Sequence, residues 1–232
     1  MKCCSQCAGI ERQFDEETAS EELDDYRREG LTGTSRTLVE ALVAAGVTGA
    51  TLLDIGGGVG AVQHALLDAG AASAVHVDAS SAYLQAAETE AEHRGLSDRI
   101  RFRHGDFVSL AAEVAPADVV TLDRVICCYH DMPALVEASA ARAQRLYGLV
   151  YPRDAWWIRV GSRFANVFLW LQRTPFRIFV HPSSAVDAIV RRQGFQLRVH
   201  RRTWFWQVVV YERQLPADLQ AKPLDNANHD RL

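Results

Sequence analysis

Short apolar runs alternate with amphipathic stretches through the middle of the chain. Five runs of five to seven residues are rich in Val, Leu and Ile and are bounded by polar residues. Between most of them, apolar residues recur at the spacing of a helix that buries one face. This pattern predicts strands at 51–55, 74–78, 100–106, 117–123 and 146–152. The segments after the first, second and fourth strands are predicted to be helices, and 107–115 a short helix or turn.

Alternating strands and helices predict an α/β fold with a mostly parallel sheet and helices on both faces, because parallel neighbours are joined through crossover helices. Residues 196–213 break this pattern. They contain two predicted strands with too few residues between them for a crossover, so these strands should pair antiparallel. A helix is predicted just before them, ending at Gly194.

The chain length suits one domain, since 232 residues and 25.7 kDa lie within the range of a single hydrophobic core. An acidic helix is expected over 11–25, followed by a second helix capped by Thr34 or Ser35 and ended by Gly46. The polar end, 214–232, shows no periodicity and is predicted to be disordered. The expected domain covers 1–213, divided into a helical segment (1–44), a cofactor-binding core (45–153), an aromatic-rich cap (154–182) and a C-terminal helix with antiparallel strands (183–213).

Charge and hydropathy restrict the expected partners and location. The chain is 48% apolar and 23% charged, with a formal charge of −4, which gives no electrostatic reason to expect a nucleic-acid partner. No apolar run approaches the length that spans a bilayer, and the N-terminus lacks the hydrophobic core of a signal peptide. A cytoplasmic protein is the resulting expectation.

The five cysteines are expected to be reduced thiols, because their number is odd and two pairs are adjacent in sequence. Cys4 and Cys7 have the spacing of metal ligands, but no second pair at zinc-finger spacing accompanies them, so no metal is predicted. Thiolates that hold a metalloid for methylation are a further alternative. The cysteines are Cys3, Cys4, Cys7, Cys127 and Cys128.

The first predicted strand runs directly into a glycine-rich loop, LLDIGGGVGAVQ, at 52–63. Glycines let a backbone turn sharply and approach a ligand, and the following helix presents its N-terminus there. The candidate contacts are Gly56, Gly57, Gly58 and Gly60. The spacing also satisfies the dinucleotide fingerprint, with Asp78 at the offset of a ribose-binding acid. The loop alone therefore leaves both a dinucleotide and another nucleoside ligand open.

Acidic residues lie at or just beyond the ends of four successive predicted strands, as Asp54, Asp78, Asp106 and Asp123. In an open α/β sheet these positions meet at the carboxyl edge, where ligands bind. A buried carboxylate close to a pyrophosphate is costly, whereas a ligand carrying an ammonium and a sulfonium would be stabilised by it. The alternative for each single aspartate is a helix cap or a turn.

With these motifs the chain resembles the class I S-adenosylmethionine-dependent methyltransferases over roughly residues 45–213. The segment from Asp54 to Gly60 matches their first motif, Asp78 the second, and Asp106 the acid beside the adenine. The resemblance implies S-adenosyl-L-methionine as cofactor and a Rossmann-like seven-stranded sheet of order 3-2-1-4-5-7-6, with strand 7 antiparallel. It also implies how the cofactor is held: Gly56 and Gly58 border the methionyl part, Asp78 and Ala79 lie at the ribose, Asp106 and Phe107 at the adenine, and Asp54 and Asp123 near the ammonium.

Candidate catalytic residues follow the fourth strand in the stretch LDRVICCYHDMP, beside the expected methyl group. Methyl transfer depends mainly on positioning, but a hydroxyl acceptor needs a base. His130 is the candidate base, because its ordinary pKa is near neutral, and Tyr129 is a second candidate. The alternative is that Asp131 caps the next helix and His130 lies exposed. The D/N-P-P-Y/W sequence of enzymes that methylate nucleic-acid bases is missing here.

The acceptor is expected beneath the aromatic segment 156–180, with Trp156, Trp157 and Phe164 as contacts and Tyr26 closing over the cofactor. This implies an apolar or planar small molecule, methylated on oxygen. The segment loosely resembles magnesium-protoporphyrin O-methyltransferases, but Cys128-Tyr129 stands where they have His-Tyr. The competing interpretation is a membrane-surface or dimer-forming helix, since arginines flank its apolar face: Arg159, Arg163 and Arg173.

Two other functions remain open from the sequence. One is an NAD(P)-dependent oxidoreductase, which Asp54 and the lack of a Tyr-x-x-x-Lys pair disfavour. The other is a non-catalytic, methyltransferase-like binding protein.

Overall fold

The computed structural model describes residues 5–214, and side chains from residue 9 onward. Seven strands form one sheet in the order β3-β2-β1-β4-β5-β7-β6. The first five strands pair in parallel, and β7 is antiparallel to both β5 and β6. This is the predicted order and direction. The strands are β1 (Thr51–Ile55), β2 (Ser73–Asp78), β3 (Ile100–His104), β4 (Ala117–Asp123), β5 (Ala143–Pro152), β6 (Phe195–Arg202) and β7 (Trp206–Arg213).

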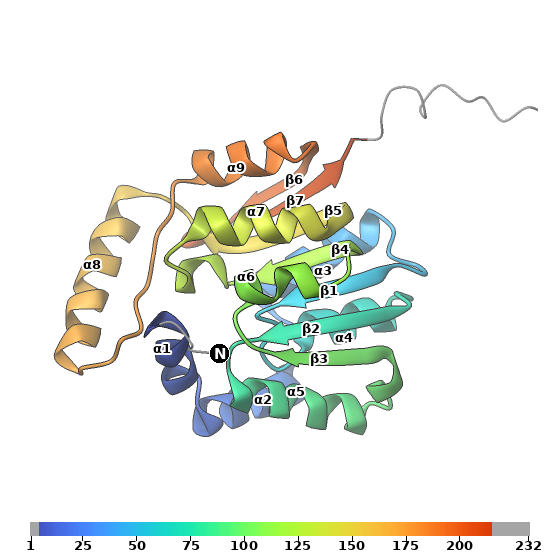
Figure 1. Ribbon diagram of the computed structural model, residues 1–232, viewed down its shortest axis with the longest axis horizontal. Coiled ribbons are helices and arrows are strands. Elements are labelled where there is room, and N and C mark those ends of the chain that lie inside the picture. Colours follow the sequence, from blue (N-terminus) through green and yellow to red (C-terminus); the bar gives the residue numbers. More distant parts are fainter. Residues whose placement is uncertain (1–4, 215–232) are drawn as a thin grey trace, which may run out of the picture.

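Helices cover both faces of the sheet and make three layers (Figure 1). The front layer holds α6 (Phe107–Leu110), α7 (Met132–Arg142) and α9 (Ser183–Arg192), and the rear layer holds α3 (Gly33–Ala44), α4 (Ala61–Asp68) and α5 (Ser81–His93). Helix α2 (Glu16–Glu29) packs on α5. Helices α1 (Ser5–Gln13) and α8 (Trp156–Leu171) lie beyond the carboxyl ends of the strands.

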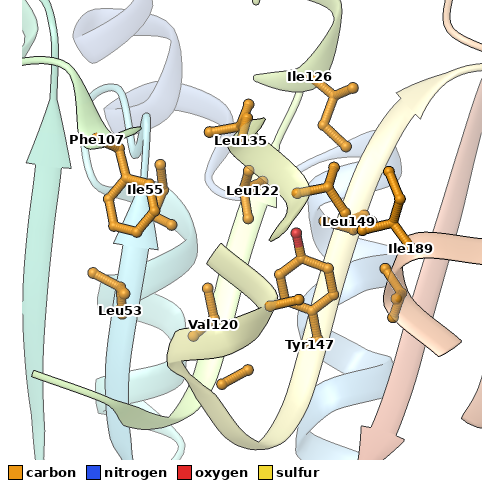
Figure 2. Packing of buried hydrophobic residues seen from close by; sticks show 14 of the residues in the cluster. Leu53, Ile55, Phe107, Val120, Leu122, Ile126, Leu135, Tyr147, Leu149 and Ile189 are labelled. Atoms are coloured by element: carbon orange, nitrogen blue, oxygen red, sulfur yellow. The ribbon is translucent and has the colours of Figure 1, made fainter. Parts of the chain in front are cut away.

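Two apolar cores separate the layers, because alternate residues of a strand point to opposite faces. Leu53 and Ile55 of β1 and Leu122 of β4 point to the front face, where Figure 2 shows them beneath Phe107 and Leu135. Residues that point the other way, such as Leu52 of β1 and Val119 of β4, pack in the rear core. Both faces of the central strands are therefore buried, as a parallel sheet requires.

The predicted strands agree with the structure, and β1 and β4 match to the residue. The N-terminal predictions need correction. The acidic helix is interrupted at Asp15, whose carboxylate accepts the Thr18 N–H at 3.0 Å and begins α2. Neither Thr34 nor Ser35 caps the next helix, which begins at Gly33, and Ser35 instead donates its hydroxyl to Asp123.

Several expectations fall outside the described residues: the tail after Gln214 and the side chains of Cys3, Cys4 and Cys7. Cys127 and Cys128 form no disulfide, and their sulfur atoms lie 3.8 Å apart. Within residues 5–214, no helix is both long enough and apolar enough to cross a membrane. The same residues contain no group of three or more His, Cys, Asp or Glu that could hold a metal ion.

Candidate active site

A cavity of about 430 Å³ lies at the carboxyl ends of β1 to β4. The four predicted acids, Asp54, Asp78, Asp106 and Asp123, all line it, together with Gly56, Gly57, Gly58, Ala79 and Phe107. Residues that are distant in sequence meet here because the four strands are parallel and in register. The volume is in the range of cofactor and small-molecule sites.

Glycine is required in this loop for two reasons, the backbone conformation and the lack of space for a side chain. Gly56, Gly58 and Gly60 have φ values of 63°, 56° and 83°, which side-chain-bearing residues rarely adopt. Gly57 is constrained differently, since a Cβ there would lie 2.7 Å from both Asp54 Oδ2 and His76 Cε1. Gly56, Gly57 and Gly58 therefore present backbone rather than side chains to the cavity, and Gly60 caps α4 without lining it.

Asp78 connects the end of β2 to this loop. Its Oδ2 accepts the N–H of Gly58 at 3.1 Å, and its Oδ1 accepts the N–H of Ser80 at 2.9 Å. Burial raises the pKa of Asp78 to about 6, although these hydrogen bonds oppose the shift. A ligand that hydrogen-bonds to the ionised carboxylate would lower this pKa again.

Asp54 is the most buried of the four acids, with 1% of its surface exposed. Thr121 donates its hydroxyl to Oδ1 at 2.7 Å, but Oδ2 has no hydrogen-bond partner. Burial raises the pKa of Asp54 to about 7, and the nearby carboxylates of Asp123 and Asp78 add to the rise. An unpartnered buried oxygen beside the cavity is a position where a ligand cation or a water molecule would be stabilised.

Asp106 lies at the N-terminus of α6 and also lines the cavity, so the helix-cap role and the ligand-binding role predicted for it are compatible. It caps α6 through the Val108 N–H and accepts the Ser109 hydroxyl at 2.9 Å. Tyr129, which also lines the cavity, donates its hydroxyl to Asp106 Oδ1 at 3.0 Å.

Asp123 ends β4 next to Arg124, whose Nε lies 3.4 Å from Asp123 Oδ1. Arg124 has a φ of 62°, a strained conformation for a residue other than glycine. Among the described residues that line the cavity, it alone carries a basic side chain. The cavity therefore combines several carboxylates with one guanidinium.

Three buried polar residues beside the glycine loop were missed from the sequence. Gln63, His64 and His76 are fully buried, and their side-chain nitrogens have no hydrogen-bond partner among the described residues. Burial lowers the pKa of His64 to about 4 and of His76 to about 3, so both are neutral at pH 7. Gln63 and His64 lie in α4 and His76 lies in β2, and nothing in the local sequence pattern indicates that these polar side chains are buried.

The other end of the cavity is apolar and comes from three separate segments. Helix α1 and the residue that follows it contribute Ile10 and Phe14. Residues 174–180 contribute Phe176 and Ile178, and the β6–β7 hairpin contributes Phe205 and Trp206. We call residues 174–180 the strap. It is anchored where the Phe179 N–H donates to the Cys127 carbonyl at 2.7 Å. The sequence did not predict that these three segments meet at the cavity, although Phe176 lies in the aromatic segment that was expected to cover the acceptor.

The structure places the predicted catalytic base outside the cavity. His130 is exposed and stacks on Tyr129 with the ring centres 5.3 Å apart. Asp131 accepts the Ala134 N–H at 3.0 Å and caps α7, which turns the His130 side chain toward solvent. Of the two candidates, only Tyr129 lines the cavity.

The predicted substrate contacts are also not brought to the cavity. Trp156 and Phe164 lie on the exposed face of α8, with 76% and 73% of their surface accessible, because only Ile158 of that helix is buried. Trp157 stacks on Trp204 at 4.2 Å. Tyr26 packs against His64 beneath Arg94, on the rear of the glycine loop, and so does not close over the ligand site.

Comparison with known proteins shows which proteins the chain is similar to in sequence and in fold. Residues 52–146 match the family model described as a methyltransferase domain. Magnesium protoporphyrin IX methyltransferase from Synechocystis PCC 6803, solved with bound SAH, aligns with a TM-score of 0.67 and 20% identity over 88% of this chain and 98% of that chain. None of the curated proteins compared matches the sequence.

Two further structures show how widely this fold is used. An O-methyltransferase family 2 protein from Planctomyces limnophilus, in complex with apigenin, aligns with a TM-score of 0.63 and 15% identity over 86% of this chain and 62% of that chain. The [4+2]-cyclase SpnF aligns with a TM-score of 0.61 and 12% identity over 78% of this chain and 82% of that chain.

Together, the sheet order, the glycine loop and the domain match define a class I S-adenosylmethionine-dependent methyltransferase fold. The match to the methyltransferase-domain model covers residues 52–146, which include the glycine loop and all four strand-end acids.

Proposed function

We propose that this protein is an S-adenosylmethionine-dependent methyltransferase that methylates an oxygen atom of a small, flat, largely apolar molecule. The observation that carries the proposal is one cavity in which four strand-end carboxylates and a glycine turn face an apolar, aromatic wall. A dinucleotide site would place a pyrophosphate beside Asp54, which has no compensating cation.

The residues present fit the cofactor. Asp78, held by Gly58 and Ser80, is suited to bind the two ribose hydroxyls. Asp106 would accept the adenine amino group beside the Phe107 backbone. The unpartnered oxygen of Asp54 and the carboxylate of Asp123 would stabilise the methionyl ammonium. Arg124, the basic residue of the wall, is suited to the methionyl carboxylate.

The remaining wall indicates what kind of acceptor would fit. Phe14, Phe176 and Trp206 offer ring faces and edges to a planar molecule. No histidine or lysine is among the described residues that line the cavity. The protein therefore suits an acceptor whose oxygen is already ionised, such as a carboxylate or an acidic phenol, because such an acceptor needs no protein base.

When bound, S-adenosylmethionine supplies a methyl carbon on a sulfonium, so that the acceptor oxygen forms the new C–O bond as the C–S bond breaks and S-adenosylhomocysteine leaves. The chain's part is to align the acceptor and exclude water, which the apolar wall and the α1 cover favour. Tyr129 would help to position the acceptor, with its hydroxyl held by Asp106.

A thermal-shift experiment tests the cofactor assignment. S-adenosylhomocysteine at about 100 times its dissociation constant should stabilise the protein by roughly 2.7 kcal/mol, or about 5–10 °C. NAD and NADP should give no shift. Asp78→Asn should abolish the shift, while Asp98→Asn, at an exposed position away from the cavity, should retain it.

Each other outcome points to a different function. A shift with NAD or NADP alone would indicate the oxidoreductase and overturn the proposal. If S-adenosylhomocysteine binds, labelled methyl transfer to planar carboxylic acids and phenols is measured next. Binding without transfer to any of them would instead favour a methyltransferase-like protein with another role, since a cyclase shares the fold.

A further inference from the structure

One face of α8 exposes seven large apolar side chains. Their accessible fractions run from 39% at Val160 to 76% at Trp156. Elsewhere in the described chain, large apolar side chains are this exposed at only three positions: Val43, Leu197 and Trp204. The seven share one side of the helix, given its 3.6-residue period: Trp156, Val160, Phe164, Val167, Phe168, Trp170 and Leu171.

Other residues of α8 already hold the helix to the protein. Ile158 is its one buried side chain, and Asn166 exchanges two hydrogen bonds with the Ile178 backbone of the strap, at 2.7 and 2.8 Å. Trp157 stacks on Trp204 of the hairpin. The apolar face is therefore fixed outward, and contiguous exposed patches of this kind usually mark an interaction surface.

The charge around this face is one-sided. Residues 155–186 contain four arginines and no aspartate or glutamate, in a chain whose formal charge is −4. The nearest acid is Asp154, whose Oδ2 lies 3.7 Å from Arg159 Nη2. Arg159 and Arg163 lie along one edge of the apolar face, and Arg173 follows the end of the helix. Tryptophans stand near both ends of the helix, at 156 and 170. Arginine edges and terminal tryptophans are features of helices that lie in a membrane interface.

We propose that α8 docks in the headgroup region of a bilayer that contains anionic lipid, with its apolar face inserted and its arginines on the phosphates. The helix has 16 residues and would lie in the membrane plane. A second copy of the chain is a poorer occupant, because two such faces would bring their arginines together. Among the described residues, Arg159 already has an acidic neighbour in Asp154, 3.7 Å away, whereas Arg163 and Arg173 form no ion pair.

This docking is independent of the proposed enzyme activity, but the two fit together. The strap that follows α8 forms part of the cavity wall, and α8 lies at the same end of the molecule as the carboxyl ends of the strands (Figure 1). An apolar acceptor dissolved in the bilayer would therefore reach the cavity from the surface on which α8 rests.

Vesicle co-sedimentation of the full-length protein tests the proposal. We expect binding to vesicles of phosphatidylcholine mixed with phosphatidylglycerol, and about tenfold or more weaker binding to phosphatidylcholine alone. High salt should weaken the former. The double variant Phe164→Ser/Phe168→Ser should lose binding to both vesicles, and Arg163→Gln/Arg173→Gln should lose the preference for phosphatidylglycerol.

Val43→Ser is the matched control, because Val43 is an exposed apolar residue on α3 and should not affect binding. All substituted side chains are at exposed or partly exposed positions, and circular dichroism checks that each variant is folded. No vesicle binding by the wild type, or binding that survives Phe164→Ser/Phe168→Ser, would overturn the proposal. A wild-type dimer that the same double variant dissociates, seen by light scattering without vesicle binding, would show a self-association face instead.

Discussion

Asp54 carries a conflict between stability and ligand binding in a single side chain. Its Oδ2 is buried against Gly57 and has no partner, so ionising it in the ligand-free protein costs free energy. The same unpartnered oxygen could interact with the positive charge of a ligand. Local strain and unsatisfied groups of this kind concentrate at functional sites, where the rest of the fold keeps them in place.

This conflict predicts a pH-dependent effect of Asp54→Asn on stability. The pKa of Asp54 is about 7 in the folded protein and about 4 in the unfolded protein. The stability that its protonated form contributes to the folded state is therefore complete below pH 4 and is lost as the pH rises through 7. An asparagine has no such loss, and its oxygen can still accept the Thr121 hydroxyl. Between pH 5 and pH 8 the variant should gain on the order of 1–4 kcal/mol relative to wild type.

Urea unfolding at the two pH values measures this difference, and comparison at each pH cancels the histidines that both proteins share. Asp98→Asn removes a negative charge at an exposed position and serves as the control. An Asp54→Asn difference that stays constant from pH 5 to pH 8 would mean that Asp54 titrates normally in the folded state.

At the scale of elements, the start of α7 determines which residues face the cavity. Pro133 lies within the first turn, and the Asp131 carboxylate accepts the Ala134 N–H. This cap fixes the chain direction just after η3 (Ile126–Cys128), so Tyr129 lines the cavity while His130 is exposed.

Two single substitutions separate the capping role from a catalytic one. Asp131→Ala should lower the free energy of unfolding by about 1 kcal/mol, the usual value of an N-cap, without altering cofactor affinity. His130→Ala should leave both stability and kcat nearly unchanged, since loss of a true general base costs about 10²–10⁴-fold. Chemical unfolding and steady-state methyl transfer check the pair, and a hundredfold loss in His130→Ala would restore histidine as the base.

Some features of these elements could be predicted from the sequence, and others could not. Strands and their end acids were found because periodicity and strand-end position are local properties, and parallel pairing brings Asp54, Asp78 and Asp123 together automatically. Ser35 was assigned as a cap from its residue type, but its partner is Asp123, 88 positions away. A hydrogen bond between distant elements leaves no trace in a local pattern.

At the scale of the molecule, the cavity is closed by opposite parts of the chain. A Cβ on Gly9 of α1 would lie 2.8 Å from the backbone nitrogen of Phe176, so α1 and the strap are in close contact. Phe14 packs edge-on against Tyr83 at 5.6 Å and against Phe176 at 5.5 Å. The aromatic pattern predicted a cover over residues 156–180. In the structure, α1 and the strap line the cavity, and no residue of α8 does so.

Hydrogen exchange should show this closure in solution. If α1 and the strap cover the bound ligand, openings that expose their amides must also release it, so saturating S-adenosylhomocysteine should slow exchange in both by up to about a hundredfold. Amides of α8 should change little, because that helix does not line the cavity, and they serve as the internal control. Protection confined to the glycine loop and the end of β2, with α1 unchanged, would mean that the N-terminal helix does not cover the ligand site.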